Sequence, residues 1–125
     1  MKQNKKIINW SFAIIWMVLI FILSSIGDFS PVTGDDYQRT DLVSSIVHVV
    51  LYVILTFLLI RAFISSGVKK KKAVAYAFIV AVLYGITDEV HQYFVPGREM
   101  HLGDWLMDTI GAFIVVSFYK IKIKK

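Results

Sequence analysis

Four long apolar segments alternate with short polar connections along this chain. They run over residues 7–26, 42–64, 73–94 and 104–121. A membrane's hydrocarbon core of ~30 Å requires about 20 mostly apolar residues in a helix, and the four segments are near that length. Isolated strands would leave backbone groups unpaired in lipid, so helices are the expected elements. The pattern therefore predicts an all-α polytopic membrane protein, a bundle of four transmembrane helices forming a single domain over residues 1–125.

The composition agrees with burial in lipid. Hydrophobic residues make up 57% of the chain and charged residues 18%, whereas soluble domains carry about 25% charged residues. The first apolar segment follows Lys2, Lys5 and Lys6, as a signal peptide would. Its apolar run over residues 7–23 is longer than a typical signal-peptide core, so we expect a retained helix. The chain has no cysteine, which excludes disulfides and thiolate metal sites.

The basic residues predict the orientation of the bundle. Twelve of the 14 Lys and Arg residues lie at the start of the chain, between the second and third segments, or in the tail. Positive charge is retained on the cytoplasmic side of membranes, so we expect both termini in the cytoplasm of a multi-pass cell-membrane protein. Lysines beside a membrane bind anionic lipid head groups. Membrane lipids are therefore the expected partners of these residues, and nucleic acid is not.

All nine carboxylates fall in the predicted outer loops or the outer halves of the predicted helices. Asp88, Glu89 and Asp108 lie within hydrocarbon depth, where a charge is costly unless it is paired or faces a wet cavity. Helical spacing places polar residues on one face of each of the last three segments. We therefore expect a shared polar pocket that opens to the outer surface. The candidate site residues, including those suggested by the resemblance below, are Ser24, His48, Tyr52, Asp88, Glu89, Gln92, Arg98, Asp104 and Asp108.

Purely structural roles compete with function at several positions. Ser, Thr and Tyr side chains often form hydrogen bonds between membrane helices, and this is the favoured interpretation for Ser24, Ser25, Ser44, Ser45, Tyr52 and Thr56. Gly111 is expected to permit close helix approach. Asp104 is a candidate N-cap of the last helix, and His91 a side chain that extends to the membrane interface. For Glu89 and His48 a functional role is favoured, because a buried acid is hard to explain as packing.

The segment Asp88-Glu89-Val-His-Gln92-Tyr-Phe94-Val-Pro96-Gly97-Arg98, followed by Asp104 and by Asp108-Thr-Ile-Gly111, resembles the VanZ-like membrane proteins. Their signature is a Glu, a Gln three residues later, a Phe-x-Pro-Gly-Arg turn, an Asp and an Asn-x-x-Gly. His48 with Tyr52 is similar to the His-x-x-x-Tyr of the family's second helix, and Phe21 to Ser25 is similar to the end of its first helix. The family takes its name from a member associated with teicoplanin resistance. The resemblance thus implies an effect on lipoglycopeptide sensitivity or the handling of a cell-envelope component.

Two positions depart from the family pattern. Ser44 and Ser45 stand where the family has an Asp-Lys pair before the histidine, and Asp108 stands where it has Asn. If that pair holds a charged ligand in relatives, this chain would use Arg98 or Arg39 instead.

Three functions are compatible with such a pocket. The first is binding of an amphiphilic or lipid-linked ligand at the outer leaflet, with Arg98 paired to a phosphate or carboxylate. The second is an enzyme acting on a lipid-linked substrate, with Glu89 and His48 as acid and base. The third is a small proton-coupled carrier, for which four helices leave little room unless the protein forms a homodimer.

No cofactor is expected from the sequence. Within the enzyme hypothesis, His48, Asp88, Glu89, His91 and Asp108 could hold a divalent metal. The chain lacks a spaced metal motif such as His-Glu-x-x-His, which makes metal the less favoured alternative.

Overall fold

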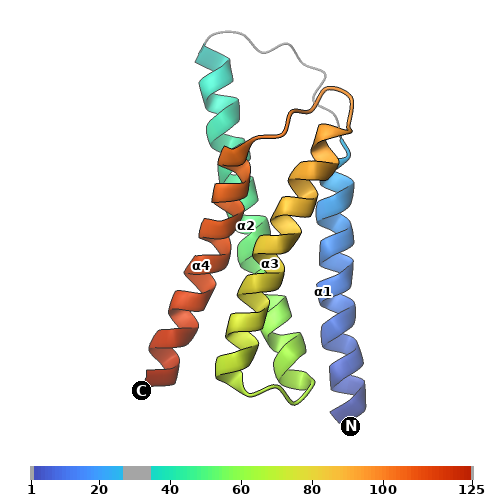
Figure 1. Cartoon of the computed structure of the whole chain (residues 1–125), viewed down its shortest axis with the longest axis vertical. Coiled ribbons are helices and arrows are strands. Elements are labelled where there is room, and N and C mark those ends of the chain that lie inside the picture. Colours follow the sequence, from blue (N-terminus) through green and yellow to red (C-terminus); the bar gives the residue numbers. More distant parts are fainter. Residues whose placement is uncertain (1, 27–34, 125) are drawn as a thin grey trace.

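The protein is a bundle of four long helices, as its apolar pattern predicts. A computed structural model describes residues 2–26 and 35–124. The helices are α1 (Lys2–Ser24), α2 (Asp35–Ser65), α3 (Lys70–Tyr93) and α4 (Leu102–Lys124). Each contains a segment long and apolar enough to cross a membrane. The start of α1, the α2–α3 connection and the end of α4 all lie at one end of the bundle (Figure 1). The three basic segments of the chain therefore share that end, and the α3–α4 connection lies at the opposite end.

Helix α2 is longer than its apolar segment. The apolar pattern predicts a start near residue 42, whereas α2 begins at Asp35 and has 31 residues, which is about 46 Å of helix. Lipid-spanning length and helix length are separate quantities, because polar residues beyond the hydrocarbon can continue the helical hydrogen bonding. Asp28 lies outside the described residues, and the side chains of Asp35, Asp36, Arg39 and Asp41 are not described.

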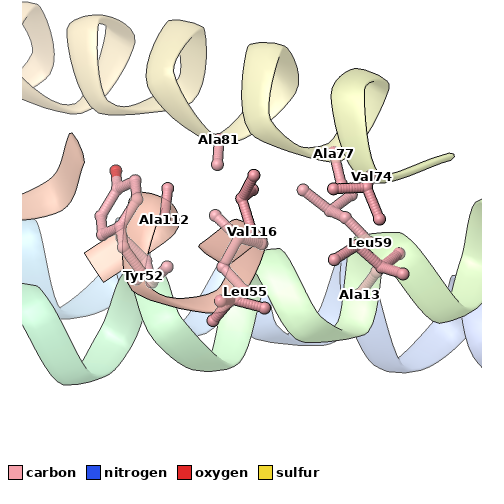
Figure 2. Close-up of a cluster of buried hydrophobic side chains, with 12 residues drawn as sticks. Ala13, Tyr52, Leu55, Leu59, Val74, Ala77, Ala81, Ala112 and Val116 are labelled. Carbon is pink, nitrogen blue, oxygen red and sulfur yellow. The ribbon is translucent and has the colours of Figure 1, made fainter. Parts of the chain in front are cut away.

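Helix α2 is the centre of the bundle and packs against the other three helices. Small side chains on α3 allow close packing: Ala73, Ala77, Ala81 and Gly85 recur every four residues, and all are buried. Such stripes of small residues bring membrane helices together, because lipid supplies no hydrophobic force between them. Ala77 and Ala81 belong to one cluster of buried side chains with larger ones such as Leu59 of α2 (Figure 2).

The packing of α4 on α2 is closer still. A Cβ atom added to Gly111 would lie 2.5 Å from the carbonyl oxygen of Val49. Only glycine fits at such a contact between two helix backbones. The expectation that Gly111 permits close helix approach is thus confirmed.

The outward faces of the helices are apolar. Ile15, Val18 and Ile22 of α1 are each more than half exposed, and so are Leu83 of α3 and Phe113 of α4. An apolar surface of this extent is not stable against water. These faces are suited to contact with acyl chains, as expected of membrane-spanning helices. The polar residues buried between the helices are therefore the unusual feature of the bundle.

Candidate functional site

A tight turn places Arg98 over the end of the bundle. The backbone N–H of Arg98 donates to the carbonyl oxygen of Val95 at 3.1 Å, and Gly97 between them has a φ of 79°. Proline second and a positive-φ glycine third are the residues that a type II turn requires. The Pro96-Gly97 pair therefore directs the chain back toward α4 and sets Arg98 beside the helix ends.

Arg98 lines a cavity of about 340 Å³ between α1 and α2. The polar lining residues are Ser24, Ser44, His48, Tyr52, Asp88 and Arg98, and the apolar ones are Ile20, Leu23, Ile26, Val47 and Leu51. Polar and apolar walls in one cavity suit a ligand that is itself amphiphilic.

Two groups in the cavity wall have unsatisfied hydrogen-bonding capacity. The Nε of Arg98 and the hydroxyl of Tyr52 are buried without a hydrogen-bond partner among the described residues. No described carboxylate lies within 4.0 Å of the Arg98 guanidinium. Buried polar groups in folded proteins are nearly always paired, so these groups are candidates for contact with a ligand.

Asp88 is held differently. Its Oδ1 accepts a hydrogen bond from the hydroxyl of Ser24, and its Oδ2 accepts one from Nε2 of Gln92 at 3.1 Å. All three side chains are buried. This network joins α1 to α3. Because both carboxylate oxygens of Asp88 already have donors, Asp88 does not pair with the unpartnered groups of Arg98 and Tyr52.

Next to the cavity, three helices bring a histidine and two acids together. His48 of α2, Glu89 of α3 and Asp108 of α4 are 7%, 1% and 0% exposed, and potential ligand atoms of the three lie within 4.8 Å of one another. Nδ1 of His48 is 2.8 Å from Oδ1 of Asp108. Oε2 of Glu89 accepts a hydrogen bond of 2.9 Å from the backbone N–H of His101. We call His48, Glu89 and Asp108 the buried triad.

Asp104 is at the edge of the triad. Its Oδ2 lies 3.8 Å from Nε2 of His48, and its side chain is 25% exposed. It lies in the first turn of α4, which begins at Leu102, so the expectation that Asp104 is the N-cap is wrong. An acid in the first turn still stabilises the helix dipole.

His91 is outside both groups. Its ring stacks on Phe21 with centroids 4.1 Å apart, and its Nε2 is 2.8 Å from the hydroxyl of Ser25. Ser25 is exposed. His91 therefore joins α1 to α3 near the end of the bundle, away from the buried triad.

The nine candidate residues separate into two adjoining sets. Ser24, His48, Tyr52, Asp88 and Arg98 line the cavity, while Glu89, Gln92 and Asp108 are buried outside its wall and Asp104 is partly exposed. The polar groups of the second, third and fourth helices thus meet in the buried triad, while the cavity lies mainly between α1 and α2 and not among those three helices. His48 belongs to both the cavity and the buried triad.

Three further contributors to the site are not among the nine candidate residues. Ser44, which helical spacing places on the inward polar face and for which the sequence favours a packing role, lines the cavity. The donor that orients Glu89 is the backbone N–H of His101. Every residue except proline has such a group, so the residue type does not indicate its role. The sequence also does not distinguish the five apolar lining residues from the lipid-facing apolar residues of the same helices.

The fold and these polar groups define a small integral membrane protein whose four helices enclose a buried polar site. The VanZ/LLP1 family model matches residues 9–123. The chain belongs to this family, as its Glu-x-x-Gln, Pro-Gly-Arg and Asp-x-x-Gly residues suggested. No match was found among curated proteins or among solved structures.

Proposed function

We propose that this protein binds the anionic head group of an amphiphile from the outer leaflet of the cell membrane, in the cavity lined by Arg98. In this proposal both termini are cytoplasmic and the α3–α4 turn faces outward. The natural ligand is a lipid-linked cell-envelope component or a lipoglycopeptide, and binding alters sensitivity to teicoplanin. Membership of the VanZ/LLP1 family supports a role in the envelope.

The observation that carries the proposal is the state of Arg98. Its guanidinium lines the cavity, and its Nε is buried without a partner among the described residues. A guanidinium donates two parallel hydrogen bonds to a phosphate or carboxylate. Tyr52, also unpartnered, adds a hydroxyl donor in the same wall.

The apolar part of the cavity supports an amphiphile over a free ion. Ile20 and Leu23 come from α1, and Val47 and Leu51 from α2. An acyl or prenyl chain along these side chains would keep contact with an apolar surface, while its head group lies beside Arg98. A free anion would gain nothing from this wall.

The test is direct binding by the purified full-length protein in detergent. The probe is a polyprenyl phosphate, and the matched ligand control is the corresponding polyprenol without phosphate. We expect Arg98→Gln to weaken phosphate binding about 10- to 100-fold, since a hydrogen bond to a charged group contributes ~1.5–3 kcal/mol. Arg61→Gln is the control variant, because Arg61 is exposed and lies against Phe57 near the opposite end of α2.

Three results would contradict the proposal: equal binding of phosphate and alcohol, no effect of Arg98→Gln, or an equal effect of Arg61→Gln. A cell-based measurement then tests the consequence. Expression of the wild-type protein should change teicoplanin sensitivity, and expression of the Arg98→Gln protein at the same level should not.

A second candidate function is an enzyme acting on a lipid-linked substrate. The short contact between His48 and Asp108 favours it, because a carboxylate that orients an imidazole is typical of acid–base sites. Glu89 would be the second proton-transfer group. Formation of product from a polyprenyl-phosphate-linked sugar by purified protein, lost in His48→Gln, would favour catalysis over binding alone.

A further inference from the structure

The buried triad has the composition of a metal site, although no spaced motif in the sequence indicates one. Its three side chains come from three helices and offer one imidazole and two carboxylates. We propose that His48, Glu89 and Asp108 bind one divalent transition-metal ion, with Zn²⁺ as the preferred ion. This inference is independent of the proposed lipid binding.

The spacing of the three side chains fits a single ion. Zinc–nitrogen and zinc–oxygen bonds are ~2.0–2.2 Å long, so two ligand atoms of one tetrahedral ion lie about 3.4 Å apart. The candidate atoms of the triad are all within 4.8 Å of one another. Side-chain movements that bring the farthest pair of these atoms closer by up to about 1.4 Å would complete a tetrahedral site.

Unpartnered oxygens give a second and separate indication. Oε1 of Glu89 and Oδ2 of Asp108 are buried and have no hydrogen-bond partner among the described residues. Glu89 is oriented through its other oxygen by the N–H of His101. The other oxygen of Asp108 contacts Nδ1 of His48, and this nitrogen would give up that contact when it binds an ion. An unpaired carboxylate oxygen at bilayer depth is costly, and an ion between the two acids would remove that cost.

The charges around the triad favour a cation. Asp104 lies 3.8 Å from His48, and Asp88 is in the neighbouring cavity wall. No Lys or Arg side chain lies within 4.0 Å of a carboxylate in the described part of the chain. His48, 2.8 Å from Asp108, can compensate at most one carboxylate of the triad, whereas a divalent ion would compensate both Glu89 and Asp108.

The ligand types select the ion. Ca²⁺ and Mg²⁺ are bound mainly by oxygen atoms, whereas imidazole nitrogen with carboxylates suits zinc and its neighbours in the first transition row. Nδ1 of His48 is the candidate ligand, because it lies on the Asp108 side of the ring. Nε2 faces Asp104, which would orient the imidazole as outer carboxylates do in zinc proteins.

The experiment measures zinc on the purified full-length protein in detergent. Protein is stripped with a chelator, loaded with Zn²⁺ and desalted, and metal per chain is determined by mass spectrometry. We expect about one ion per chain, as one triad implies, bound in the presence of excess Mg²⁺. Replacement by Co²⁺ should give visible absorption bands characteristic of nitrogen and oxygen ligands.

Glu89→Gln and Asp108→Asn keep the side-chain shape and remove a charged ligand. Removing a side chain that only supports a ligand weakens metal binding by about 10- to 100-fold. Each of these variants removes a ligand itself, so zinc binding should weaken by more than about 10-fold. Glu99→Gln is the carboxylate control, because Glu99 is exposed at the same end of the chain's bundle. Arg98→Gln should retain zinc, which separates this inference from the lipid proposal.

Absence of zinc from the wild-type protein would overturn the inference, and so would retention of zinc by both triad variants. Equal loss in Glu99→Gln would also overturn it, since zinc would then be bound at the surface. Circular dichroism and gel filtration identify a variant that fails to fold. In that case the Co²⁺ bands of the wild-type protein remain decisive, because bands without a nitrogen ligand exclude His48.

Discussion

The contact between Gly111 of α4 and Val49 of α2 allows a sharp test of how the bundle positions its polar groups. The substitution Gly111→Ala adds one carbon atom that would lie 2.5 Å from the carbonyl oxygen of Val49. Real Cβ atoms essentially never approach another atom closer than 3.0 Å. The two helices must therefore separate locally by at least 0.5 Å, the difference between these distances.

The consequence extends to the buried triad. His48 precedes Val49 in α2, and Asp108 lies one helical turn before Gly111 in α4. A separation of 0.5 Å along the 2.8 Å contact between His48 and Asp108 would lengthen it to about 3.3 Å, where a hydrogen bond is weak. Overpacking of this kind costs ~1–3 kcal/mol, and the higher helix propensity of alanine offsets up to about 1 kcal/mol.

We therefore expect Gly111→Ala to lower the free energy of unfolding by up to about 2 kcal/mol, which is the overpacking cost of ~1–3 kcal/mol less a full propensity gain of about 1 kcal/mol. The assay is reversible unfolding of the purified protein in mixed micelles with increasing SDS. The matched control is Gly103→Ala in the same helix, where an added Cβ has no atom within 4 Å. That substitution should leave stability unchanged or raise it by up to about 1 kcal/mol.

Equal stability of the two alanine variants would refute this reasoning. It would mean that α2 and α4 approach each other less closely than the structure has them, or that they separate at no cost. In either case the proximity of His48 and Asp108 would lose its physical basis.

Two further predictions concern orientation and the support of Glu89. Because the chain has no cysteine, Glu99→Cys and Lys70→Cys provide single labelling sites; an impermeant maleimide added to intact cells should label the first and not the second, and the reverse pattern would contradict cytoplasmic termini. His101→Pro removes the N–H that donates to Glu89 and should be ~1–3 kcal/mol less stable than His101→Ala, which keeps it. SDS unfolding measures this difference, and equal stability would show that the hydrogen bond contributes nothing.

The number of membrane helices and the position of each apolar span follow from the sequence, because the cost of exposing polar backbone in lipid leaves few alternatives. The convergence of His48, Glu89 and Asp108 is likewise predictable, since helical spacing places each on the polar face of its apolar segment, where a charge needs a partner. Helical spacing gives the direction of a side chain around its own axis. It therefore predicts which residues turn inward.

The identity of the neighbouring helix was not predictable in the same way. Over residues 12–23 helix α1 is apolar on all sides, so this part of its sequence indicates no packing face. For this reason the sequence does not predict that the cavity lies between α1 and α2 and not among the three helices with polar stripes. The early start of α2 at Asp35 was missed for a related reason, because hydropathy marks the lipid boundary and not the end of a helix.

Glycines on the same helices explain how acids this deep come within reach of His48. Besides Gly111, Gly85 of α3 is buried, and an added Cβ there would lie 3.1 Å from Trp105 and 3.2 Å from Oδ2 of Asp108. A larger residue at Gly85 would displace the carboxylate that contacts His48. The glycines thus let the helix backbones approach each other closely. This close approach brings a buried acid on one helix within reach of its polar partner on the next.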